Sequence, residues 1–167
     1  MIRTLKDFEY IYGQEIENTQ KVFKHVTDKS LLLEFSPDVR SLGRLAWHIT
    51  TTITEMMEKT GLRLAGPRPD DPVPSSSKAI FKAYNEAAIS LLDQIRSAWT
   101  DATLEAEDEL YGEKWKRSTT LLALIRHEIH HRGEMIVLMR LAGLAVPGIY
   151  GPTREEWAQW GVEPPKV

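Results

Sequence analysis

Apolar residues recur along the chain at spacings of three and four positions, which is the pattern of amphipathic α-helices with one buried face. This pattern predicts helices over residues 4–27, 41–60, 77–99 and 118–142. Alternating apolar and polar stretches, which are typical of β-strands, form no convincing series. Four long amphipathic helices joined by loops imply an all-α protein with the architecture of a four-helix bundle.

Residues that favour helix ends mark the expected boundaries. Thr4 is expected to cap the first helix, and Asp38 or Ser41 the second, because their side-chain oxygens can accept hydrogen bonds from the free N–H groups of a first helical turn. Ser118 or Thr119 occupies the equivalent place before the fourth helix. The predicted boundaries therefore rest on capping chemistry as well as on hydrophobic periodicity.

Two further segments complete the predicted chain. Residues 100–117 are first acidic and then aromatic and basic, and they form either a loop or a small hairpin that turns at Gly112. A short C-terminal helix is expected to run through Trp157 and Trp160. Because 167 residues can bury one sizeable core, residues 1–167 are expected to form a single domain.

Composition narrows the class of protein. The charged fraction of 27% is ordinary for a globular protein, and with a net charge of -3 and no basic block we expect no nucleic-acid partner. The absence of cysteine excludes disulfides, thiolate metal ligands and a cysteine nucleophile, and it fits a cytoplasmic protein. The first residues lack the apolar core of a signal peptide, and no run approaches the roughly 20 apolar residues that span a bilayer, so no membrane partner is expected.

Three of the five histidines lie within five residues of one another in the fourth predicted helix. At about 100° per residue, His127 and His131 lie one turn apart on the face that carries Leu124 and Met135, so they point toward the bundle interior. His130 lies about 100° away from His131 and is peripheral. Two inward histidines at positions i and i+4 can place their nitrogens on one ion, so the pair predicts a metal site rather than hydrogen-bonded structural histidines.

A third metal ligand is expected from a neighbouring helix. His48 is the best candidate because it lies at the border of the apolar face of the second predicted helix. A three-histidine site leaves one or more positions open to water or substrate, which is typical of catalytic metal sites. We expect such a metal ion to activate either a water molecule or a substrate thiol. All-histidine ligation suits zinc, nickel, copper and iron alike.

The same residues also satisfy the H-E-x-x-H motif of zinc proteases, from His127 to His131. In that interpretation Glu128 is the general base, and Glu155 or Glu156 supplies the third ligand. We regard this as the weaker interpretation, because so short a motif often matches by chance and no strand series offers a substrate-binding edge. Glu128 more simply caps, pairs or orients a group beside the metal ligands.

Glu15 and Thr52 are expected to line the pocket or to support the ligands. Glu15 falls on the apolar stripe of the first helix, and its preferred interpretation is an edge position whose carboxylate reaches solvent; the alternative is a carboxylate that faces a polar pocket. Thr52 lies one turn after His48. Trp47 points away from the apolar face of its helix, so a contact between subunits is slightly preferred to a covering loop.

Residues 42–49 (LGRLAWHI) and 127–134 (HEIHHRGE) resemble the DinB/YfiT-like superfamily of bacterial metal proteins, and the tail at residues 146–153 (VPGIYGPT) resembles some of its members. The resemblance extends over nearly the whole chain. The resemblance also implies that Glu134 lines the pocket or supports the ligands. The family commonly carries glutamine at this position, so the glutamate is a modest departure.

The resemblance implies a four-helix bundle that forms a homodimer and holds a divalent metal ion, most often zinc or nickel, through His48, His127 and His131. Characterised members of the family include thiol-dependent transferases and isomerases, so the resemblance also implies a small-molecule substrate, with a low-molecular-weight thiol among the candidates. Activation of a metal-bound water would instead make the protein a hydrolase. The alternative is a metal-stabilised bundle without catalytic activity that binds a small molecule or a partner.

Overall fold

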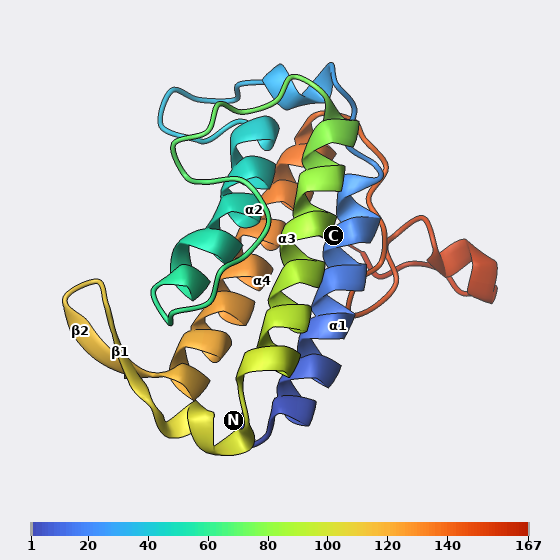
Figure 1. The fold of residues 1–167 in the computed structure, drawn as a ribbon. Helices are drawn as coiled ribbons and strands as arrows, with labels where there is room; N and C mark the ends of the chain where they lie inside the picture. Colours follow the sequence, from blue (N-terminus) through green and yellow to red (C-terminus); the bar gives the residue numbers. More distant parts are fainter. Residues whose placement is uncertain (1, 167) are drawn as a thin grey trace.

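Four long helices dominate the computed structural model, which describes residues 2–166 (Figure 1). The helices are α1 (Leu5–Phe23), α2 (Leu42–Glu58), α3 (Ser77–Ala98) and α4 (Arg117–Leu141). α1 packs on α3 and α4, and α2 also packs on α3 and α4, so α1 and α2 occupy opposite corners of the bundle. The predicted all-α four-helix bundle is therefore confirmed.

A small hairpin separates α3 from α4, and three short 3-10 helices lie in the connections. The hairpin strands are β1 (Glu107–Leu110) and β2 (Glu113–Lys116), and the 3-10 helices are η1 (Ser30–Leu32), η2 (Asp101–Glu105) and η3 (Trp157–Trp160). The strands are antiparallel and turn at Tyr111 and Gly112, whose φ angles of 54° and 82° are both positive. Of the two alternatives for residues 100–117, the hairpin is thus correct.

The first two helices begin where capping chemistry predicts. The Thr4 hydroxyl accepts a hydrogen bond from the backbone N–H of Asp7, while the Asp7 carboxylate accepts one from Thr4. The Ser41 hydroxyl accepts one from the N–H of Arg44. The fourth helix differs, because it begins at Arg117 without a side-chain cap. There β2 runs directly into α4 and the Arg117 N–H bonds the carbonyl of Ala106, so a hydroxyl cap is not needed.

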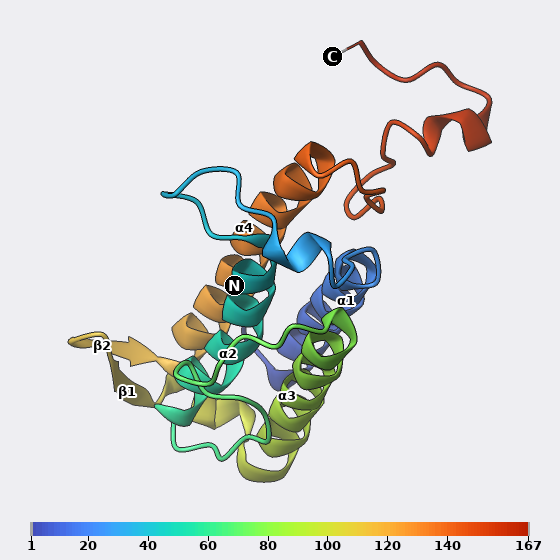
Figure 2. The same ribbon diagram turned by 90° about the horizontal axis from the view of Figure 1, so that it is seen from above.

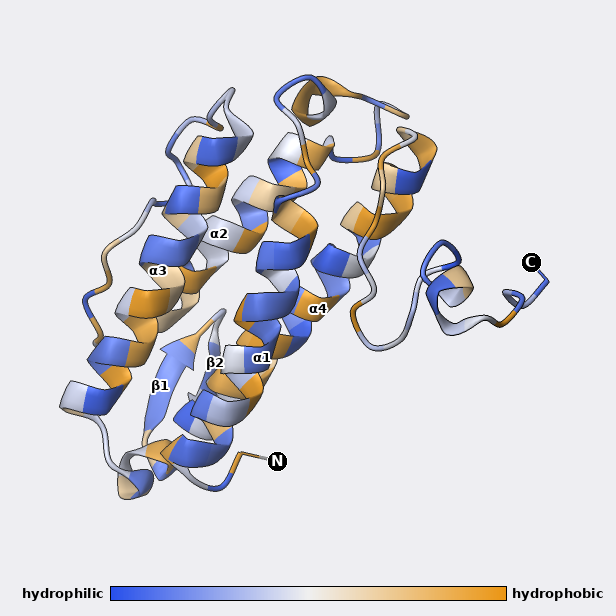
Figure 3. Ribbon diagram, turned by 90° about the vertical axis from the view of Figure 1, so that its right-hand side faces the viewer, coloured by the Kyte–Doolittle hydropathy of each residue, from blue (hydrophilic) through white to orange (hydrophobic). Residues whose placement is uncertain are grey.

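The helices turn apolar residues inward and polar residues outward, as their alternating colours show (Figure 3). α4 is the exception, because α1 and α2 flank it on two sides and it buries two stripes of residues. One stripe, with His127 and His131, faces α2, and the other, with Glu128 and Arg132, faces α1. The second stripe explains why α4 buries charged residues among its apolar ones.

Two connections cover the start of α2. The indole Nε1 of Trp47 donates to the carbonyl of Asp71 at 2.9 Å, and Trp47 is only 7% exposed. The predicted subunit contact at Trp47 is therefore wrong, because the loop between α2 and α3 covers this side chain. On the other side, the Leu31 carbonyl lies 2.9 Å from the point where a Cβ on Gly43 would stand, so this glycine lets η1 approach α2 closely.

The segment after α4 leaves the bundle, and η3 lies away from the four helices (Figure 2, Figure 3). The short helix expected through Trp157 and Trp160 is present as η3. None of the helices in the described part of the chain combines the length and the hydrophobicity required to cross a bilayer.

Candidate metal centre

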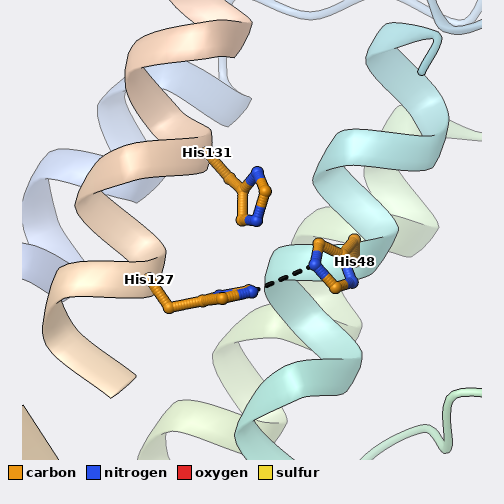
Figure 4. A group of neighbouring side chains, drawn as sticks. All are labelled: His48, His127 and His131. Carbon is orange, nitrogen blue, oxygen red and sulfur yellow. Dashed lines mark hydrogen bonds between the residues drawn. The ribbon is translucent and has the colours of Figure 1, made fainter. Parts of the chain in front are cut away.

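Three histidine rings converge between α2 and α4, as the sequence predicts (Figure 4). His48 comes from α2, and His127 and His131 come from successive turns of α4. One ring nitrogen of each residue lies within 4.8 Å of those of the other two. The Nε2 atoms of His48 and His127 are 3.0 Å apart. We call this group the histidine triad.

The triad has the donor set and the spacing that suit a divalent transition metal ion. Two nitrogens bound at about 2.0–2.1 Å to a tetrahedral ion lie about 3.3 Å apart, close to the separation between His48 and His127. The Nδ1 atom of His131 is 2.6 Å from a carboxylate oxygen of Glu134, which leaves its Nε2 atom for a metal ion. His130 has a side chain that is 67% exposed and lies outside the triad, as predicted.

Burial keeps two histidines of the triad, His48 and His127, in the neutral form that binds metal ions. It lowers the pKa of His48 to about 4, with further contributions from Arg40 and His131. Burial and the neighbouring histidines also lower the pKa of His127 to about 4. Both rings are therefore neutral at about pH 7, so a metal ion does not have to displace a proton from them.

Glu134 supports the triad from outside. Burial acts to raise the pKa of this carboxyl, but the hydrogen bond and the charge of His131 outweigh burial and lower that pKa. A carboxylate that accepts a hydrogen bond from Nδ1 fixes the ring orientation and the tautomer, and it makes Nε2 a stronger ligand. The glutamate at this position therefore gives His131 a charged hydrogen-bond acceptor, where a glutamine would offer a neutral one.

Replacing Glu134 by alanine is expected to weaken metal binding about 10- to 100-fold, because His131 loses the group that orients it. Glu134→Gln should lose less, since its amide oxygen still accepts the hydrogen bond from Nδ1. Competition with a chromophoric chelator measures both affinities. Glu109→Ala, at an exposed position of β1, serves as the control. Equal affinities for Glu134→Ala and Glu109→Ala would remove Glu134 from the site.

The other two predicted pocket residues do not contact the triad. The Thr52 hydroxyl donates to the backbone carbonyl of His48 at 2.7 Å, so it bonds to α2 itself and not to the imidazole. Glu15 is only 6% exposed, and its carboxylate lies 2.5 Å from Arg132 and 2.6 Å from the Tyr150 hydroxyl. The expectation that this carboxylate reaches solvent is therefore wrong, because a buried cation on α4 pairs with it.

Arg132 is the buried charge that the sequence analysis missed. It is 1% exposed, and its guanidinium donates to Glu15 on α1, to the Thr19 hydroxyl at 3.0 Å and to the Tyr150 hydroxyl at 2.6 Å. Through Tyr150 it also attaches the C-terminal segment to the bundle. A signal was present in the sequence, because a lone glutamate on an apolar stripe predicts a cation on a facing helix.

The structure does not support the zinc-protease interpretation. Glu128 is 1% exposed, and it accepts hydrogen bonds from the hydroxyls of Thr19 and Tyr84 at 2.6 and 2.5 Å. These bonds direct its carboxylate toward α1 and α3, whereas the triad lies between α2 and α4. The proposed third ligands are engaged elsewhere, Glu155 with Arg140 and Glu156 with backbone N–H groups of the tail.

Two cavities flank the triad. The larger, of about 530 Å³, has mainly apolar walls and meets the centre at Glu134. The smaller, of about 330 Å³, is polar and includes His48 itself in its wall. We call them the apolar cavity and the polar cavity. Both volumes suit a small molecule, and Arg40 lines both cavities.

Comparison with known proteins agrees with these features. The model of the DinB family matches residues 1–164. The chain is 41% identical to the uncharacterized protein YrdA of Bacillus subtilis (strain 168) over 167 residues, which is 100% of both chains. It is also 41% identical to a DinB-like protein from Bacillus cereus ATCC 10987, whose crystal structure gives a TM-score of 0.86 over 90% of this chain and 100% of that one. The DinB-like protein YjoA from Bacillus subtilis, 20% identical, has the same fold with a TM-score of 0.68 over 88% of this chain and 99% of that one. The chain therefore belongs to the DinB family.

Proposed function

We propose that the protein is a metal-dependent enzyme that acts on a small molecule, either as a thiol-dependent transferase or as a hydrolase. The observation that carries this proposal is the histidine triad, in which imidazoles from two helices meet beside two cavities. Within the described residues the group contains three histidines and no fourth protein ligand. Three protein ligands with an open position are typical of catalytic sites, whereas structural sites are closed by four.

The side chains have separate tasks in this proposal. His48, His127 and His131 hold a divalent ion, with zinc or nickel preferred, and Glu134 holds the His131 ring in position. A bound ion of this kind supplies a Lewis acid that lowers the pKa of a water or thiol. The cavity walls position the substrate beside it. The proposed working form is a homodimer, and size-exclusion chromatography with light scattering tests that part.

Elemental analysis of the purified protein and of His48→Ala provides the test. We expect about one equivalent of zinc or nickel in the wild-type protein and a strongly reduced content in the variant. Transfer of a thiol to an electrophilic aryl halide, and hydrolysis of an activated ester, should both be assayed with metal-loaded protein. Circular dichroism establishes that the variant remains folded.

The outcomes separate the two functional classes. Loss of turnover in folded His48→Ala supports the enzyme. Absence of stoichiometric metal in the wild-type protein, or unchanged turnover in the variant, contradicts it. If chelation lowers the melting temperature but neither reaction proceeds, the result favours a metal-stabilised bundle that only binds small molecules.

A further inference from the structure

Arg40 is placed where it can contact a substrate on either side of the triad. It lines both the apolar cavity and the polar cavity, next to Glu134 in the first and next to His48 in the second. Its side chain is close enough to lower the pKa values of His48 and Glu134 through its charge. Arg40 directly precedes Ser41, the N-cap of α2, so it lies at the end of the connection that leads into this helix.

The cation at this position is free to bind an anion. Arg40 makes no salt bridge within the described part of the chain, and neither does Arg44, which lines the polar cavity one helical turn before His48. The nearby carboxylate of Glu134 is engaged by His131. Two arginines without a salt bridge to any described residue therefore line the polar cavity together with His48.

The acidic residues of the polar cavity are already engaged. Glu55 accepts a hydrogen bond from the Tyr111 hydroxyl at 3.2 Å, and Asp71 accepts one from the backbone N–H of Arg68 at 2.7 Å. The first turn of α2 contains no acidic residue. The free backbone N–H groups of this turn lie at the N-terminal end of the helix, which favours negative charge. In the polar cavity, hydrogen bonds thus already occupy the two carboxylates, while Arg40 and Arg44 have no ion pair among the described residues and are available to a negatively charged group. The apolar cavity adds the carboxylates of Asp38 and Glu134, so such a group binds on the polar side.

We propose that Arg40, assisted by Arg44, is a specificity-determining residue that binds an anionic group of the substrate while another group of the same molecule reaches the metal ion. The substrate class is thus a small organic acid, with a carboxylate a few bonds from the reacting atom. A guanidinium suits a carboxylate because it donates two parallel hydrogen bonds to it. This inference rests on the proposed function, since it assumes a metal ion in the triad.

The inference is tested by measuring how tightly the protein binds thiols that carry either a carboxylate or a hydroxyl group. The measurement is of binding and not of turnover. The probes are 3-mercaptopropionate against 3-mercaptopropanol, which have the same length, and the corresponding acid and alcohol one carbon longer. Protein loaded with cobalt(II) reports thiolate binding by its charge-transfer absorption. The variants are Arg40→Ala and Arg40→Lys, with Arg63→Ala as the control, because Arg63 is exposed and lines neither cavity.

We expect at least one acid to bind the wild-type protein about tenfold more tightly than its matched alcohol, because of a charge-assisted hydrogen bond. Arg40→Ala should bring this ratio close to one, Arg40→Lys should retain part of it, and Arg63→Ala should leave it unchanged. If acids and alcohols bind equally well to protein with full cobalt occupancy, the role of Arg40 is overturned but the proposed function is not. Failure of the protein to hold cobalt overturns the proposed function and this inference with it.

Discussion

His127→Ala is expected to weaken the binding of zinc or nickel by more than about 100-fold, which exceeds the usual effect of losing a residue that only supports a ligand. His130→Ala is expected to change the affinity by no more than about twofold. The two residues lie in the same helix only three positions apart, but His127 contacts His48 while the His130 side chain is 67% exposed. Competition titrations with a chromophoric chelator measure both affinities.

This comparison also tests an alternative arrangement of the same side chains. His130, His131 and Glu134 form a second group whose ligand atoms lie within 4.8 Å of one another at the surface. If that group held the metal ion, His130→Ala would cause the large loss and His127→Ala the small one. The variant that loses more metal affinity therefore identifies which of the two groups binds the metal ion.

Arg132→Met is expected to lower the free energy of unfolding by about 3–5 kcal/mol, because it leaves the buried carboxylate of Glu15 without a cation. The substitution also removes the hydrogen bonds that the Arg132 guanidinium donates to the hydroxyls of Thr19 and Tyr150. Chemical denaturation followed by circular dichroism measures the change. Arg126→Met is the matched control, since Arg126 lies on the same helix and is exposed.

A double variant shows whether the stability lost in Arg132→Met comes from the unpaired charge of Glu15 or from lost packing. In Glu15→Leu/Arg132→Met both buried charges are gone, so a large part of the stability lost in the single variant should return. An Arg132→Met protein that is as stable as Arg126→Met would contradict the structural role of this ion pair. A double variant no more stable than Arg132→Met would assign the loss to packing or to the hydroxyl partners.

The histidine triad could be predicted because it depends on local geometry. Helical periodicity alone placed His127 and His131 on one inward face and His130 at its side, and the apolar border of α2 identified His48. The predictions for these histidines required only the phase of a regular helix, which the sequence determines well. Glu134 was instead expected from the resemblance to the DinB/YfiT-like superfamily.

The features that depend on tertiary contacts could not be predicted in the same way. The environment of Glu15 is set by Arg132, which lies 117 positions later in the chain. The covering of Trp47 by Asp71 depends on the path of an irregular loop. The start of α4 at Arg117 depends on a bond to Ala106 across the hairpin. Hydrophobic periodicity carries no information about such pairings between distant segments.

The division between rigid and irregular backbone around the centre has an evolutionary consequence. The three histidines of the triad belong to regular helices, whereas residues 38–40 and 69–73, which contribute walls to the two cavities, belong to connecting segments. Insertions or substitutions in those segments can reshape the cavities while the bundle and its histidines remain in place. A lineage that starts from this scaffold can therefore change which small molecule fits the cavities without rebuilding the triad.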